Sequence, residues 1–513
     1  MGHRTRYFLA ITVLCFQAIS FPVGNAVAVE TNNIATTNAK LRLSYERIRL
    51  PANEHMGLLG TSMLYDVNDW LSIGPAAYGA VSGQRGGFIT LGLAGDLRLP
   101  VSDYIDLNTG IFVGAGGGRG GFTIQGGGLM LRSHLGLTAK LADWAHLGGG
   151  ISYVDFPNGS IHSLQPYLTY EYPFSALLTH GWPELGIDTT ATPQLASSRQ
   201  ELSLVYRHYR IPHGVQTDTR TVQYPTIRLL GIEWQNYLDN NLFVKIESEG
   251  AMGGQSNGYM QILFGAGYRL PLISGTALKF AASVGVAGGG GVATGGGLLL
   301  DGSLGIQQTI TDKLFAELDG GYVKSPGASF RAMSLAAKLG YHYATPDTDA
   351  NEVPITTLAG FDQQKIRFRF VQQTYLQANP NWRQHHANLN VDNLGFQADW
   401  FVTPWLYLSG QGIAAWRGQA GGYMTGLVGG GLHLPVANSP LFVELEGLVG
   451  AAGGGGLDVA GGLVWQANAN VGYHFSDAYS VLGSYGYMAA PKGNFRARVI
   501  GLSFAYQFSF FSR

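Results

Sequence analysis

Three stretches of the chain repeat one pattern of hydrophobic and polar positions. Each stretch opens with glycines and then alternates, at residues 126–138, 295–307 and 460–471. In the first copy one parity carries Leu129, Leu131, Leu135 and Leu137. The other parity carries Met130, Arg132, His134 and Thr138. A period of two predicts a β-strand with one apolar face and one mixed or polar face.

The repeat extends beyond this motif and divides the chain into three units. Aligned on the motif, the units begin near Lys40, Glu201 and Lys365. The predicted organisation is a signal peptide at 1–28, units at 40–174, 201–343 and 365–513, and linkers at 175–200 and 344–364.

Each unit is expected to contain eight strands. In the first unit we place them at about 41–50, 57–67, 71–82, 88–99, 104–115, 128–141, 145–156 and 164–174. Short turns, such as Asn68-Asp69 and Ala142-Asp143, alternate with longer or glycine-rich loops. This alternation predicts an all-β, up-and-down antiparallel barrel of the kind found in outer membranes.

The alternation also indicates which face meets lipid. In the strand near residue 265, the apolar parity carries Met260, Ile262, Phe264, Ala266, Tyr268 and Leu270, and the other parity carries Gln261, Gly265, Gly267 and Arg269. A soluble sandwich would show its charged face to water. Here the apolar face is the continuous one, which predicts that this face lies in the hydrocarbon interior of a membrane.

Aromatic residues recur where strands meet the short turns. They are Trp70, Trp144, Trp234, Tyr237, Trp400, Trp405, Tyr473 and Tyr479. Amphipathic rings at the headgroup level form the aromatic girdle of membrane barrels. We therefore predict that these residues form such a girdle.

The leader and the last strand complete a resemblance to bacterial outer-membrane β-barrel proteins. The leader has a basic start at His3, Arg4 and Arg6, an apolar core and a small-residue site at 26–28. The last strand places Phe504, Tyr506, Phe508 and Phe510 on one face, although the chain ends at Arg513. The resemblance implies an integral, multi-pass protein of the cell outer membrane, surrounded by membrane lipid, whose last strand is recognised by the assembly machinery.

Two features favour three tandem barrels over the alternative, one 24-stranded barrel. The joints between units are long, polar and rich in Pro and Thr. Each unit also carries inward charges of both signs, which must pair inside a filled eight-stranded barrel. The first unit has Arg42, Glu46, Asp96, Arg98, Asp106, Arg132, Lys140 and Glu171. The second has Glu233, Lys245, Glu247, Glu249, Arg269, Lys279, Asp301 and Lys338, and the third has Arg367, Arg369, Asp399, Glu444 and Glu446.

Composition and motifs disfavour nucleic-acid binding, a disulfide framework and a phosphate-binding loop. Only 13% of residues are charged, the net charge is -1, and the single cysteine, Cys15, lies in the leader. These values favour neither nucleic acid as a partner nor a disulfide framework. The glycine runs at 114–121, 288–291 and 453–456 lack the Lys-Ser/Thr of a phosphate loop, so we interpret them as strand ends and hairpin loops.

No catalytic, cofactor-binding or metal-binding residue is predicted. The adjacent His385 and His386 would point to opposite faces of an extended chain, while His134, His342 and His474 fall on the inward parity. The pair His162-Ser163 is the only arrangement that suggests a lipid hydrolase, and the other units lack it. Basic residues near the long loops are potential contacts for lipopolysaccharide phosphates: Arg85, Arg119, Arg331, Lys492, Arg496 and Arg498.

The sequence thus predicts a non-catalytic outer-membrane protein with a structural or surface-interaction role. Two alternatives remain. The first is a porin or channel formed by one large barrel, and the second is a lipid-modifying outer-membrane enzyme.

Overall fold

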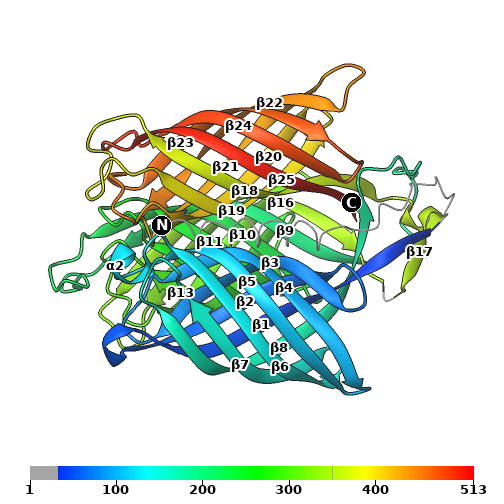
Figure 1. Cartoon of the computed structure of the whole chain (residues 1–513). Coiled ribbons are helices and arrows are strands. Elements are labelled where there is room, and N and C mark those ends of the chain that lie inside the picture. The colour runs from blue at the N-terminus through cyan, green and yellow to red at the C-terminus, as the bar shows by residue number, and fades with distance from the viewer. Residues whose placement is uncertain (1–32, 349) are drawn as a thin grey trace, which may run out of the picture.

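A computed structural model describes residues 33–348 and 350–513. The predicted signal peptide at 1–28, with Cys15, lies outside these residues. The described chain is almost entirely β-structure, as predicted, and its strands cross Figure 1 between the left and right ends of the molecule. Within the described part, no helix has both the length and the apolar character to cross a membrane.

The first eight strands close on themselves and form ring 1. Each strand pairs antiparallel with the next, and β8 pairs back with β1, for example Leu43 with Tyr170. The strands are β1 (Asn33–Arg49), β2 (His55–Asp66), β3 (Leu71–Ser82), β4 (Ile89–Ser102), β5 (Ile105–Gly117), β6 (Leu129–Ala142), β7 (Ala145–Asp155) and β8 (His162–His180).

The next eight strands form ring 2, a closed barrel in which β9 pairs with both β10 and β16. They are β9 (Ser197–Arg210), β10 (Thr226–Tyr237), β11 (Leu242–Gly253), β12 (Met260–Pro271), β13 (Thr276–Gly288), β14 (Leu298–Thr309), β15 (Leu314–Lys324) and β16 (Arg331–Pro346). Because β9 pairs with β16, the alternative of a single 24-stranded barrel is wrong.

The last eight strands form ring 3, in which β18 pairs with both β19 and β25. They are β18 (Asp362–Gln377), β19 (Val391–Thr403), β20 (Leu406–Arg417), β21 (Met424–Pro435), β22 (Leu441–Gly453), β23 (Leu463–His474), β24 (Tyr479–Ala489) and β25 (Arg496–Ser512).

Rings 1 and 3 are also hydrogen-bonded to each other at the end where the short turns lie. There β8 pairs with β25 over three residues, beginning with His180 opposite Phe508, and the short β17 (Glu352–Pro354) pairs with the start of β1. The two rings therefore form one continuous sheet system. The segments between rings pack around a small apolar cluster that includes Leu177, Val353 and Phe361. These segments therefore contribute buried apolar side chains, although the sequence predicts them as polar linkers.

The longer loops gather at the opposite end, on the left of Figure 1, where the short helix α2 (Gly121–Gln125) lies. Burial alternates along the strands as the sequence pattern predicts. On β16, Leu335 and Leu339 are 60% and 57% exposed, whereas Lys338 between them is buried. The barrel exterior is thus apolar and its interior polar, the arrangement that a lipid surrounding requires.

The aromatic girdle is confirmed only in part. Trp70, Trp144 and Trp405 are exposed beside the short turns, as predicted. Tyr237 is an error in the prediction, because its ring lies inside ring 2 and its hydroxyl donates to Glu201 Oε1 at 3.0 Å.

Candidate functional site

The interior of each ring has two halves, and the half nearer the long loops is filled by apolar side chains. In ring 3, Trp382 folds inward from the loop after β18, stacks on Phe495 at 6.0 Å between ring centroids and donates its indole N–H to the Ala387 carbonyl at 2.7 Å. Tyr375 and Tyr423 complete this plug, and all four side chains are fully buried.

Rings 1 and 2 are plugged in the same way at the same end. Phe88 and Phe156 meet edge to face at 5.8 Å in ring 1. Tyr209 and Tyr259 both pack against Phe330 in ring 2. In every ring a loop folds inward to close the end. Solutes therefore meet a packed core at the mouth of each ring.

The other half of each interior is filled by ion pairs. In ring 3, Arg367 lies 2.8 Å from Asp399 and 2.7 Å from Glu444, while Arg369 lies 2.6 Å from Glu446. None of these five side chains is more than 4% exposed. Removing one partner from such a pair would leave a buried uncompensated charge.

Ring 2 has the densest network. Lys338 bridges Glu233 and Glu317, each at 2.8 Å, and Lys279 bridges Glu317 and Glu201, each at 2.9 Å. One void beside this network has a volume of about 10 Å³. That is about the space of one water molecule, so the side chains of the network fill most of the space around it.

Ring 1 repeats the arrangement with different residues. Arg42 lies 2.6 Å from both Asp96 and Glu171, and Arg132 lies 2.7 Å from Glu46. His134 contacts Asp96 at 3.1 Å, which confirms its expected interior position.

Sequence reasoning found most of these charges but missed several. Arg98, Lys140 and Arg269, predicted inward, are only half-buried. Five members of the networks were not predicted: Lys40, Glu201, Arg207, Glu317 and Asp319. Glu201 and Arg207 have the same inward parity as Ser203, so the alternation along the strand was sufficient to place both side chains inside the barrel.

The glycine runs lie where the rings touch one another, at three seams. Each seam joins a hairpin loop of one ring to a hairpin loop of another: β3–β4 with β13–β14, β11–β12 with β22–β23, and β20–β21 with β5–β6. The loops are hydrogen-bonded across the seams, from Gly86 N to Gly295 O at 2.8 Å and from Gly421 N to Gly126 O at 3.1 Å. The rings thus follow one another in a closed cycle.

Six glycines from the three rings form a closed circle of backbone contacts where the seams meet. A Cβ on any one of them would come within van der Waals reach of the backbone of the next. In order they are Gly87, Gly289, Gly258, Gly454, Gly422 and Gly118. Only residues without side chains permit such an approach, so the glycine runs are hairpin loops, as predicted, and also the places where backbones meet.

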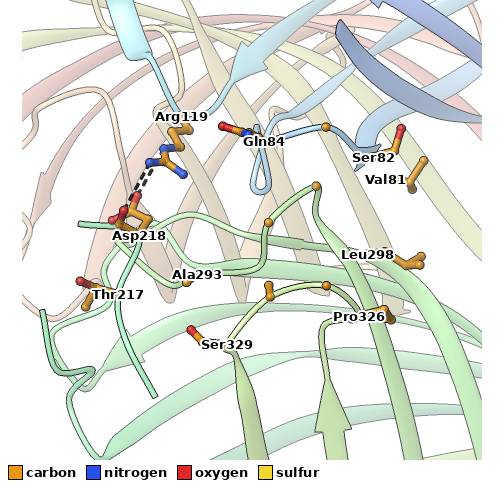
Figure 2. A pocket seen from close by; sticks show the side chains of 15 residues that line it. Val81, Ser82, Gln84, Arg119, Thr217, Asp218, Ala293, Leu298, Pro326 and Ser329 are labelled. Carbon is orange, nitrogen blue, oxygen red and sulfur yellow. Dashed lines mark hydrogen bonds and ion pairs between the residues drawn. The ribbon is translucent and has the colours of Figure 1, made fainter. Parts of the chain in front are cut away.

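A cavity of about 560 Å³ opens at the seam between rings 1 and 2. Figure 2 shows Arg119 reaching from ring 1 to Asp218 of ring 2, with which it forms an ion pair at 3.6 Å. The remaining lining is small or neutral and includes Ser82, Gln84 and Ser329. The cavity therefore offers hydrogen bonds to a small polar molecule, but its one pair of opposite charges is already matched.

The candidate catalytic pair does not assemble. His162 points outward and its Nδ1 lies 2.5 Å from Asp155 Oδ1, whereas Ser163 points inward and accepts a hydrogen bond from Arg49 N at 2.8 Å. Adjacent strand residues face opposite sides, so this serine and this histidine cannot act on each other. His385 and His386 pack against the Phe122 ring, and among the described residues no cluster of His, Cys, Asp and Glu has the arrangement of a metal site.

The basic loop residues differ in their surroundings. Arg85 pairs with Glu54 at 2.5 Å, and Arg119 pairs with Asp218 as described above. Arg496 donates to backbone carbonyls, including that of Phe495 at 2.7 Å. Arg331 faces outward on β16 and is exposed.

No protein-family model matches the sequence, and no curated protein is similar to it. Solved structures with some likeness include OpdQ of Pseudomonas aeruginosa, at 11% identity over 94% of this chain and 98% of that one, with a TM-score of 0.20. The siderophore receptor PirA of Acinetobacter baumannii has 10% identity over 92% of this chain and 80% of its own, with a TM-score of 0.27. Scores this low do not indicate a shared overall arrangement, so function must be argued from the rings themselves.

The rings have the features of a protein that spans a membrane with strands. Their outward faces are apolar, their inward faces are polar and paired, and exposed tryptophans lie beside the short turns. Closed sheets with this arrangement are the β-structures that membranes accept, and they are found in outer membranes. The chain is an integral outer-membrane β-barrel protein.

Proposed function

We propose that the chain is a non-conducting outer-membrane protein made of three sealed eight-stranded barrels, one for each ring. Its role is structural and surface-presenting rather than catalytic or transporting. The observation that carries this proposal is the double filling of each interior, with an apolar plug at one level and an ion-pair network at the other.

Three further features support the proposal. An eight-stranded barrel has an interior just wide enough for side chains. The hydrogen-bonded loops and the six touching glycines also join the rings to one another at the loop end. Each ring closes by pairing of its own first and last strands, so the pairing between β8 and β25 adds a joint without opening ring 1 or ring 3.

Conductance in planar lipid bilayers tests the proposal. The purified full chain is expected to give no discrete current steps under conditions in which a general porin, inserted in parallel, gives large ones. Regular steps from the purified protein would favour the channel alternative. A separate assay of lipid A from cells with and without the gene addresses the enzyme alternative, because altered acylation would contradict a non-catalytic role.

A further inference from the structure

The outward face of ring 2 carries a row of four cationic side chains at its loop end. Lys324 ends β15, Arg331 begins β16, Arg210 ends β9, and Arg228 lies near the start of β10. All four are exposed, and the strands are consecutive neighbours in the barrel. We call this row the basic border.

The strand register places these side chains side by side. Lys324 lies directly opposite Arg331, which puts their Cβ atoms about 4.5–5.5 Å apart. Arg210 lies opposite Met333 and is therefore diagonal to Arg331, at about 7–8 Å. Arg228 lies opposite His208 and is diagonal to Arg210 in the same way. The basic border is thus continuous across four strands.

The basic border lacks a counter-charge from the protein. In the part of the chain that the structure describes, none of its four side chains forms an ion pair or a side-chain hydrogen bond. The outward-facing neighbours on these strands contain no carboxylate: they are Tyr206, His208, Thr226, Leu230, Tyr322, Met333 and Leu335. Like charges directly opposite each other destabilise a sheet, so an external anion would stabilise this arrangement.

The positions of Lys324 and Arg331 are occupied differently in the other two rings. In ring 1 the pair Asp155 and His162 stands where ring 2 has Lys324 and Arg331, and its two side chains bond each other. In ring 3 the pair is Ala489 and Arg496, and the arginine is held by backbone carbonyls of its own loop. The facing pair of unpaired cations, Lys324 and Arg331, is therefore specific to ring 2.

The basic border stands directly above an apolar surface. Below Arg331 on β16, the outward positions are apolar and include Met333, Leu335 and Leu339, each more than half exposed. A ligand that fits both surfaces has acyl chains with phosphate at its head. We propose that the basic border binds the phosphate groups of an outer-leaflet glycolipid whose acyl chains lie along β16. This rests on the proposed function for its orientation, with the long loops outside.

The test uses the full-length protein in detergent and native mass spectrometry with two probes, bis-phosphorylated lipid A and the same lipid without phosphates. The variant Arg210→Gln with Arg331→Gln removes two charges from the basic border. The control, Lys313→Gln with Lys365→Gln, removes two charges at the opposite end, near the short turns, where Lys313 pairs with Asp362 at 3.6 Å. Because the border residues are exposed, the variant is expected to fold, and heat-modifiable gel mobility checks this.

We expect the wild type and the control to bind the bis-phosphorylated lipid alike, and the border variant to bind it about 10- to 30-fold more weakly. The phosphate-free lipid should bind weakly to all three proteins. Equal binding by the border variant, or equal binding of the phosphate-free lipid, would overturn the proposal. Conductance separates the two proposals: current steps would contradict the sealed barrels while leaving the lipid result intact.

Discussion

The interior of the rings and the seams between them are both tightly packed, but by opposite means. The interior is filled with large and charged side chains, such as Trp382 in a plug and Arg367 in an ion-pair network. At the seams there are almost no side chains, and glycine backbones touch one another.

The difference shows how the shape of each region determines the size of the side chains found there. A closed eight-stranded sheet encloses a volume that only side chains can fill. Where the hairpin backbones of two rings touch, as at Gly258 and Gly454, no space is left for a side chain. Removing a side chain should therefore damage the interior, and adding one should damage a seam.

The largest expected effect comes from removing a charge in the interior. Arg367→Met leaves Glu444 buried without its guanidinium partner, while Asp399 keeps its ion pair with Arg369. We expect a loss of about 3–5 kcal/mol in the unfolding free energy, because an isolated buried charge is strongly unfavourable. Urea titration of the folded, heat-modifiable species measures this loss.

Arg47→Met is the matched control, because Arg47 is exposed on the outside of β1. It should change the unfolding free energy by less than about 0.5 kcal/mol. Equal midpoints for the two variants would mean that the ion-pair network does not hold the interior together.

The next effect comes from adding a side chain at a seam. Gly453→Val places a Cβ against the backbone nitrogen of Gly258 in the neighbouring ring, and Gly453 has an ordinary backbone conformation. The expected cost is about 1–3 kcal/mol, because two backbones must separate. Limited proteolysis between rings 2 and 3, at residues 347–361, should become faster. Unchanged proteolysis and stability would show that the seam is loose.

The smallest effect is expected at an outward-facing glycine away from every seam. Gly483→Val meets open space, since nothing lies within 4 Å of an added Cβ. Its unfolding free energy should stay within about 0.5 kcal/mol of the wild type. A cost as large as that of Gly453→Val would mean that valine itself, rather than the seam, is responsible.

The sequence predicts the strands and their two faces well because both follow from a period of two. Lys338 lies inside and Leu339 outside, as their parity requires. Tyr237 was misassigned because proximity to a turn does not fix which way a side chain points, whereas its parity with Glu233 and Gln235, both buried, does.

The seams and the basic border could not be predicted in the same way. The glycine runs indicate where backbones can approach, but not which ring approaches which, because that depends on contacts far apart in the chain. Likewise, the outward cations Arg210 and Arg331 are separated by a whole ring of sequence and become neighbours only when β16 pairs with β9.

Cysteine cross-linking across the closing strand pairs tests the central claim, closure of each ring on itself, most directly. The sequence has a single cysteine, Cys15, which lies in the predicted signal peptide. Leu204 and Leu339 lie opposite each other on β9 and β16, at a spacing that permits a disulfide. The account predicts a disulfide in Leu204→Cys with Leu339→Cys, and none in Leu168→Cys with Leu204→Cys. A disulfide between positions 168 and 204, joining β8 to β9, would contradict it.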